Sequence, residues 1–166
     1  MDMEERQSRL WWALVCAATL GGLALRIAAA RGGLWTDEAW SVIYAARAGD
    51  AAGVFLRINH DNNHHLYSLW LQAIGPAASP MLARLPAIVA GTLCVPLAAI
   101  TVARRSAWTG IVAAILFAVS PTMVNFGSEA RGYSLMLLAA LGFLWLAAEA
   151  VEGREKPRTP WWLGLV

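Results

Sequence analysis

Four long apolar runs constrain the fold of this chain more than any other feature of its sequence. They cover residues 10–30, 85–103, 107–124 and 132–151. A helix needs about 20 apolar residues to cross a bilayer, so each run predicts a transmembrane helix. The nine tryptophans and the hydrophobic fraction of 58% are also typical of a multi-span membrane protein and not of a soluble domain. The sequence therefore predicts an all-α polytopic membrane protein.

The two ends of the chain raise separate questions. The alanines at 28–30 resemble a signal-peptide cleavage site, but the segment before the first run carries three acids against two arginines. A signal peptide normally starts with net positive charge, so a first span is favoured. A further apolar segment begins at Trp161 and predicts the start of a fifth span. We therefore expect residues 1–166 to form the N-terminal part of a longer transmembrane domain, with the chain truncated inside that span.

Basic residues predict the orientation of the spans. They flank the runs at Arg6, Arg9, Arg104, Arg105, Arg154, Lys156 and Arg158. Short loops rich in Lys and Arg face the cytoplasm, and with four spans all of these residues fall on one side. This arrangement places two outer loops on the opposite side, at about residues 31–84 and 120–131.

The first outer loop is expected to carry two helices that lie against the membrane. Thr36 or Asp37 can cap the first, which runs to about residue 49 and places apolar side chains at three- and four-residue spacing. The second covers residues 65–75, which are too few to span and suit an interfacial helix. Counting this segment as a span would put Arg104 and Arg105 outside and break the charge pattern.

Several polar residues of the outer loops are candidates for chemistry, and each also has a structural interpretation. Asp37 and Glu38 suit either a catalytic site or the negative first turn of a helix. In "DNNHHLYSL", His64 or His65 suits a sugar, phosphate or metal contact, whereas Asp61, Asn62 or Asn63 suits a helix cap. Glu129 and Arg131 form either a site or a surface ion pair of small energetic value. Arg84 and Arg26, near the outer ends of two spans, suit anchoring at the lipid headgroups.

Four motifs in this order carry a family resemblance. They are "LWTDEAWS", "NNHHLYSLWL", "ARLPAIVAGTL" and "SPTMVNFGSEARGYSLMLL". Together they resemble the N-terminal half of the polytopic lipid-phosphosugar glycosyltransferases of the GT-C fold. The chain is most similar to bacterial members of glycosyltransferase family 39, the protein mannosyltransferase-like group, and more distantly to aminoarabinose transferases. The resemblance covers nearly the whole chain.

The resemblance implies roles for individual residues. The family carries an Asp-Glu pair after its first span, and its Asp acts at the catalytic centre, which implies a catalytic Asp37. The residues implied to contact substrate are Glu38, His64, Arg84, Glu129, Arg131 and Tyr133. The family has a proline at the position of His65, so the role of the second histidine is not carried over.

The resemblance also implies the reaction and its partners. The expected donor is a sugar on a polyprenyl phosphate, and the expected acceptor is a hydroxyl of a protein, lipid or glycan. Asp37 suits the base that takes the acceptor proton, and Arg131, with Arg84, suits the lipid phosphate. A single displacement would invert the sugar carbon. Some GT-C enzymes use a divalent cation, but the sequence offers no firm ligand set and implies no other cofactor.

The expected location is the inner membrane of the cell, as a multi-pass protein with its active face outside the cytoplasm. The net charge of +2 and the lack of a basic stripe indicate no nucleic-acid partner. One alternative is a transporter or flippase-like protein, which would place charges or broken helices at mid-membrane. Another is an inactive fragment of the glycosyltransferase with only a structural role.

Overall fold

The computed structural model describes residues 3–58, 64–104 and 106–151, and these ranges are helical with short connections and contain no strand. The helices are α1 (Met3–Ala29), α2 (Thr36–Arg47), α3 (Ala51–Leu56), α4 (His65–Ile74), α5 (Pro80–Val102), α6 (Ala107–Val119), α7 (Pro121–Phe126) and α8 (Tyr133–Val151). The predicted all-α class is therefore confirmed. The predicted fifth span from Trp161 and the basic cluster at 154–158 lie outside the described residues.

Three of the described helices are long and apolar enough to cross a membrane. They are Gln7–Ala29 within α1, Pro80–Val102 (α5) and Tyr133–Val151 (α8), and they correspond to the first, second and fourth apolar runs. α6 is apolar but has only 13 residues, which is about 20 Å of helix and shorter than the roughly 30 Å hydrocarbon core. The chain is thus a polytopic membrane protein in which one helix is short.

The third apolar run does not form one helix to residue 124, as the sequence analysis expected. α6 ends at Val119, Ser120 adopts an extended ψ of 125°, and a new helix starts at Pro121. Proline has no N–H to continue the ladder, and its ring disfavours helical geometry at the residue before it. The Ser-Pro pair therefore divides the run into α6 and α7.

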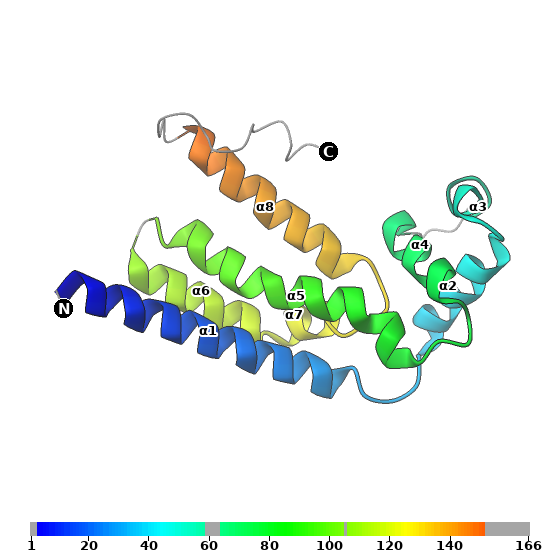
Figure 1. Cartoon of the computed structure of the whole chain (residues 1–166), viewed down its shortest axis with the longest axis horizontal. Coiled ribbons are helices and arrows are strands. Elements are labelled where there is room, and N and C mark those ends of the chain that lie inside the picture. Colours follow the sequence, from blue (N-terminus) through cyan, green and yellow to red (C-terminus); the bar gives the residue numbers. More distant parts are fainter. Residues whose placement is uncertain (1–2, 59–63, 105, 152–166) are drawn as a thin grey trace.

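α5 is the central helix of the bundle and contacts α1, α6 and α8 (Figure 1). Its buried face consists largely of small residues, among them Ala87, Ala90, Gly91, Ala98 and Ala99. Small side chains allow helix backbones to approach closely, which is the usual source of packing energy between helices in lipid. This packing fixes α5 relative to α1 and α8.

The helices α2, α3 and α4 gather at one end of the bundle, and the α5–α6 turn lies at the other end (Figure 1). The prediction that Thr36 or Asp37 caps α2 is wrong, because Trp35 occupies the N-cap position and the side chain of Glu38 accepts its backbone N–H at 3.1 Å. α4 begins at His65 after His64. The proposed caps Asp61, Asn62 and Asn63 lie outside the described residues.

Candidate active site

A buried ion pair between Glu38 and Arg84 organises the α2–α4 end of the bundle. Nε and Nη2 of Arg84 donate to the two carboxylate oxygens of Glu38, at 2.8 and 2.5 Å. The remaining N–H groups of Arg84 donate to the carbonyls of Ala30, Gly32 and Gly33. All five donors of this guanidinium are engaged, which is the condition under which a buried charge is tolerated.

These contacts change the interpretation of both residues. Arg84 is buried and does not extend to the headgroups, so the anchoring interpretation is wrong. Its donors are already used, and the structure gives no support to the expected contact between Arg84 and a lipid phosphate. Glu38 is fully buried and accepts hydrogen bonds on both oxygens, which leaves its carboxylate unavailable to a substrate in this conformation.

Glu38 also fixes the loop between α7 and α8. Its Oε1 accepts the backbone N–H of Ala130 at 2.6 Å. Because Ala130 lies between Glu129 and Arg131, this bond holds both charged residues beside the first turn of α2. The segments joined here are 92 residues apart in the sequence, so Glu38 connects the first turn of α2 to the α7–α8 loop.

Asp37, Glu129 and Arg131 meet at this junction. Nη1 of Arg131 lies 3.1 Å from a carboxylate oxygen of Asp37 and 3.8 Å from one of Glu129. The Asp37 side chain is 54% exposed, whereas those of Arg131 and Glu129 are 13% and 15% exposed. The cluster therefore presents one accessible carboxylate next to a partly buried arginine. The sequence analysis predicted that these three residues belong to one site.

Aromatic side chains form one side of the cluster. The guanidinium carbon of Arg131 lies 4.7 Å from the centre of the Tyr133 ring, a cation–π distance. Tyr133 in turn contacts His64 and Phe126, each with ring centres 4.9 Å apart. A Cβ on Gly132 would lie 2.7 Å from Cβ of His64, so this contact requires glycine at position 132. His64 and Tyr133, both predicted site residues, therefore lie beside Arg131.

Burial changes the pKa values of two of these groups in opposite directions. Burial lowers the pKa of His64 below its ordinary value, and the charge of Arg131 lowers it further. Burial raises the pKa of the Glu129 carboxyl, an effect opposed by Arg131 and reinforced by Glu38 and Asp37. His64 is consequently held neutral, as expected for a histidine packed between a glycine and a tyrosine.

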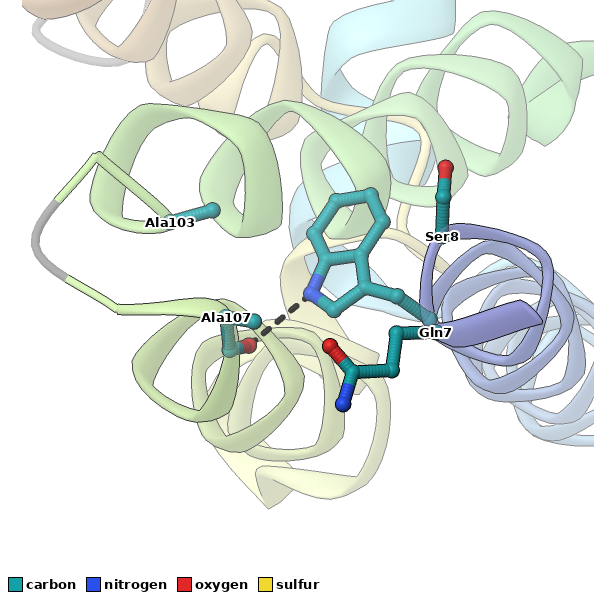
Figure 2. Close-up of a pocket in the computed structure, with 5 residues that line it drawn as sticks. Gln7, Ser8, Ala103 and Ala107 are labelled. Atoms are coloured by element: carbon teal, nitrogen blue, oxygen red, sulfur yellow. Dashed lines mark hydrogen bonds between the residues drawn. The ribbon is translucent and has the colours of Figure 1, made fainter. Parts of the chain in front are cut away.

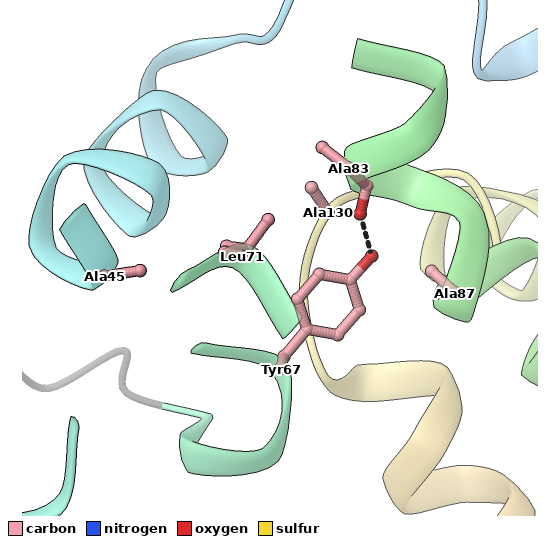
Figure 3. Close-up of a cluster of buried hydrophobic side chains, with 6 residues drawn as sticks. All are labelled: Ala45, Tyr67, Leu71, Ala83, Ala87 and Ala130. Carbon is pink, nitrogen blue, oxygen red and sulfur yellow. Dashed lines mark hydrogen bonds between the residues drawn. The ribbon is translucent and has the colours of Figure 1, made fainter. Parts of the chain in front are cut away.

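The α4 helix packs next to the cluster through a small apolar core. Tyr67 and Leu71 of α4 pack against four buried alanines from α2, α5 and the α7–α8 loop (Figure 3). The Tyr67 hydroxyl donates to the carbonyl of Ala83 at 2.7 Å, and burial raises the pKa of Tyr67. This core fixes α4, and with it His64, against the N-terminal end of α5.

A polar cavity of about 220 Å³ adjoins the cluster. It is lined by Ala29, Trp35, Arg84, Asn125, Ser128 and Glu129. A second cavity, of about 360 Å³, lies at the other end of the bundle between α1 and the α5–α6 turn (Figure 2). Among the described residues, no charged side chain lines that second cavity, and its Trp11 indole donates to the carbonyl of Ala107. Of these two cavities, the first borders predicted site residues, and a much smaller pocket is lined by His64 and Arg131.

Sequence reasoning missed the role of Arg26. This residue of α1 is fully buried and does not extend to the headgroups. It donates to the carbonyls of Gly22, Phe117 and Met123, and so joins α1 to both sides of the α6–α7 break. The neighbouring Ser-Pro break was the available signal, because a broken helix exposes carbonyls that a buried cation can bind.

The described residues contain no group of three or more His, Cys, Asp and Glu side chains placed to hold a metal ion. Asp37 and Glu129 are the nearest approach to such a group, and both contact Arg131. The sequence left open which residues would bind a divalent cation, and the described side chains identify no such set of ligands.

Comparison with known proteins identifies the family to which the chain belongs. The sequence model of the dolichyl-phosphate-mannose-protein mannosyltransferase family matches residues 63–166, more than half of the chain. Comparisons with curated proteins and with solved structures gave no match. The matched region contains α4 to α8 and the Glu129–Arg131 loop. The chain therefore belongs to the dolichyl-phosphate-mannose-protein mannosyltransferase family and is a membrane glycosyltransferase of the mannosyltransferase type.

Proposed function

We propose that this protein transfers a sugar from a polyprenyl-phosphate donor to an acceptor hydroxyl, with inversion at the sugar carbon and on the extracytoplasmic face. The single observation that supports this best is the contact between the exposed carboxylate of Asp37 and the guanidinium of Arg131. A carboxylate next to a guanidinium supports the proposal, because such a transfer needs a base and a cation for the phosphate.

In the proposed reaction Asp37 accepts the proton of the acceptor hydroxyl as its oxygen bonds to the anomeric carbon. The bond from that carbon to the phosphate oxygen breaks at the same time, and the lipid phosphate leaves as a monoester. A phosphate departs without a general acid, so one base suffices. Arg131 holds the phosphate and its developing charge, and Tyr133 and His64 orient the guanidinium from the side. A single displacement of this kind inverts the anomeric carbon.

The basic residues support the proposed face of the membrane. Arg9 lies near the start of α1 and Arg104 follows the end of α5, and these two helix ends lie at the end of the bundle away from α2, α3 and α4 (Figure 1). Positive residues in short loops favour the cytoplasm. With that end inside, the Asp37–Arg131 cluster faces the outer compartment, where an inner-membrane glycosyltransferase of this type would meet its acceptor.

Arg26 favours the alternative of a transporter, because buried intramembrane charges often mark solute pathways. Its contacts argue against that use. Three backbone carbonyls accept hydrogen bonds from its guanidinium. Arg26 lines neither the cavity of about 220 Å³ nor the cavity of about 360 Å³. We therefore assign Arg26 to the stability of the helix break.

Asp37→Asn tests the proposed function. The side chain keeps its size but cannot accept the acceptor proton, so turnover should fall by roughly 10² or more. The measurement is transfer of radiolabelled mannose from a polyprenyl-phosphate donor by membranes containing the full chain, with protein level and melting temperature followed in parallel.

Asp50→Asn is the matched control for this test. Asp50 is also an acid at a helix start in the first outer loop, where it caps α3 by accepting the N–H of Gly53. Asparagine retains this capping, so activity and stability should be unchanged. Normal turnover in a folded Asp37→Asn variant would show that Asp37 is not the base.

A further inference from the structure

The polar cavity beside the cluster has a mixed lining that suits a particular class of ligand. The cavity is lined by the half-exposed indole of Trp35, the amide of Asn125, the hydroxyl of Ser128 and the carboxylate of Glu129. Arg84 also lines the cavity, but all of its N–H donors are engaged with Glu38 and with backbone carbonyls. The cavity therefore offers an aromatic face and neutral or acidic hydrogen-bonding groups, but no available cation.

This combination excludes two of the ligands that the site must handle. A phosphate needs positive charge or several N–H donors, whereas this lining offers the single amide of Asn125 and an arginine whose donors are all engaged. A prenyl chain needs an apolar groove, whereas four of the six lining residues present polar groups to the cavity. A pyranose ring fits, because one of its faces carries C–H groups that pack on an indole while its hydroxyls need amide, hydroxyl and carboxylate partners.

The position of the cavity connects it to the phosphate site. Glu129 lines the cavity, and its carboxylate lies 3.8 Å from Nη1 of Arg131. In a sugar phosphate a single oxygen joins the ring to the phosphorus, so a phosphate held by Arg131 must have its sugar in the adjoining space. Trp35 begins the α2 segment that carries Asp37 two residues later.

We propose that this cavity is the pyranose subsite of the donor, with Trp35 as the stacking surface and with Asn125, Ser128 and Glu129 contacting the hydroxyls. This inference rests on the proposed function, because it takes Arg131 as the ligand of the donor phosphate. Ser128 already donates its hydroxyl to the carbonyl of Asn125 at 3.1 Å, so its oxygen acts as an acceptor toward the sugar. The Asn125 amide is exposed and supplies a donor.

An alternative interpretation of Trp35 is a membrane-interface anchor, which is a common role of exposed tryptophan. Trp40 provides the matched control. It lies on the same helix, is 46% exposed against 56% for Trp35, and stacks on Tyr44 away from the cavity lining. An anchoring role predicts similar effects of alanine at both positions, whereas a sugar subsite predicts an effect at Trp35 alone.

The experiment measures binding in the absence of acceptor, with the full chain in lipid nanodiscs. The two probes are a short-chain prenyl phosphate that carries mannose and the same prenyl phosphate without sugar. Trp35→Ala should weaken binding of the mannosyl probe about tenfold, the scale of a lost aromatic contact. Its affinity for the sugar-free probe should be unchanged, and Trp40→Ala should alter neither affinity. Asn125→Ala should likewise weaken binding of the mannosyl probe and leave the affinity for the sugar-free probe unchanged.

The outcomes separate this inference from the proposed function. Equal weakening of both probes by Trp35→Ala, or the same loss in Trp40→Ala, would overturn the subsite. An effect of Trp35→Ala confined to the acceptor KM in a transfer assay would also overturn it, since the pyranose would then belong to the acceptor. If transfer fails but the selective loss of mannosyl binding is observed, the subsite stands and the proposed reaction falls. Failure of the wild type to bind either probe would refute both.

Discussion

Asp37 and Glu38 are neighbours in the sequence but have opposite environments. Successive residues of a helix point about 100° apart. That rotation directs Glu38 into the junction of α2, α5 and the α7–α8 loop, where it is fully buried, and leaves Asp37 more than half exposed. The catalytic proposal for Asp37 and a structural role for Glu38 follow from this one difference. The positions of the two acids in the sequence do not by themselves reveal this difference in exposure.

Glu38→Gln should therefore destabilise the protein. Only one of the two terminal atoms of the glutamine amide can accept hydrogen bonds, whereas both carboxylate oxygens of Glu38 do so. The charge of Arg84 would also be left without its partner, which typically costs about 3–5 kcal/mol for a buried pair. We expect a clearly lower melting temperature in detergent, with Asp37→Asn close to wild type. A Glu38→Gln variant with normal melting temperature but no transfer would instead indicate that Glu38 contacts the substrate.

The pKa of His64 predicts a dependence of stability on pH. Burial and Arg131 lower the pKa of His64 in the folded state, so below about pH 6.5 the unfolded chain binds more protons at this residue. Stability contributed by neutral His64 is thus present above that pH and lost as the pH falls. Burial raises the pKa of Glu129, which acts in the opposite direction, because the folded state retains its proton to higher pH.

His64→Gln isolates the histidine contribution. The glutamine does not titrate, so the melting temperature of this variant should fall less than that of the wild type between about pH 7.5 and 5.5. Thermal unfolding of both proteins at the two pH values provides the comparison. Equal falls would show that His64 has the same pKa in the folded and unfolded states.

At the scale of elements, the α6–α7 break depends on one cation and on the space made for it. Arg26 reaches from α1 to the carbonyls of Phe117 and Met123. A Cβ on Gly91 of α5 would lie 2.8 Å from Nε of Arg26 and 2.8 Å from Cα of Gly127. Glycine at position 91 therefore leaves space for the Arg26 side chain. The arginine in turn binds carbonyls on both sides of the helix break, which precedes the Glu129–Arg131 loop.

Gly91→Ala should lower the melting temperature, because an added methyl group in this tight contact typically costs about 1–3 kcal/mol. Gly21→Ala is the control, since a Cβ at Gly21 would have no neighbour within 4 Å. Alanine stabilises an exposed helix relative to glycine, so this control should be neutral or slightly stabilised. Equal melting temperatures for the two variants would mean that the contact around Arg26 relaxes without cost.

At the scale of the molecule, the helices place the site and the basic turn at opposite ends. In a variant with Cys16→Ala and Cys94→Ala, which removes both native thiols, single cysteines at the exposed positions Thr122 and Ala107 report on the two ends. In intact cells an impermeant maleimide should label Thr122→Cys, and Ala107→Cys should react only after permeabilisation. The reverse pattern would place the Asp37–Arg131 cluster in the cytoplasm.

Much of this architecture was determined by local sequence. The apolar lengths predict the spans α1, α5 and α8, because crossing a bilayer requires a continuous apolar segment. The short helix α4 and the site residues Asp37, His64, Glu129, Arg131 and Tyr133 were also predicted, the residues through their family motifs. Their convergence in space agrees with that grouping, although their chemical roles stay predictions.

Tertiary structure alone decided which charges are buried. Glu38 and Arg84 are 46 residues apart, and Arg26 binds a carbonyl 91 residues away, so no local pattern of residue types specifies their partners. A buried charge depends on hydrogen bonds from several elements at once, and those exist only after α1, α2, α5 and α7 have packed. For that reason the sequence identified an acid pair after the first span, and the family motif implied a catalytic Asp37, whereas only the folded chain showed that Glu38 is buried against Arg84 and that Asp37 is exposed.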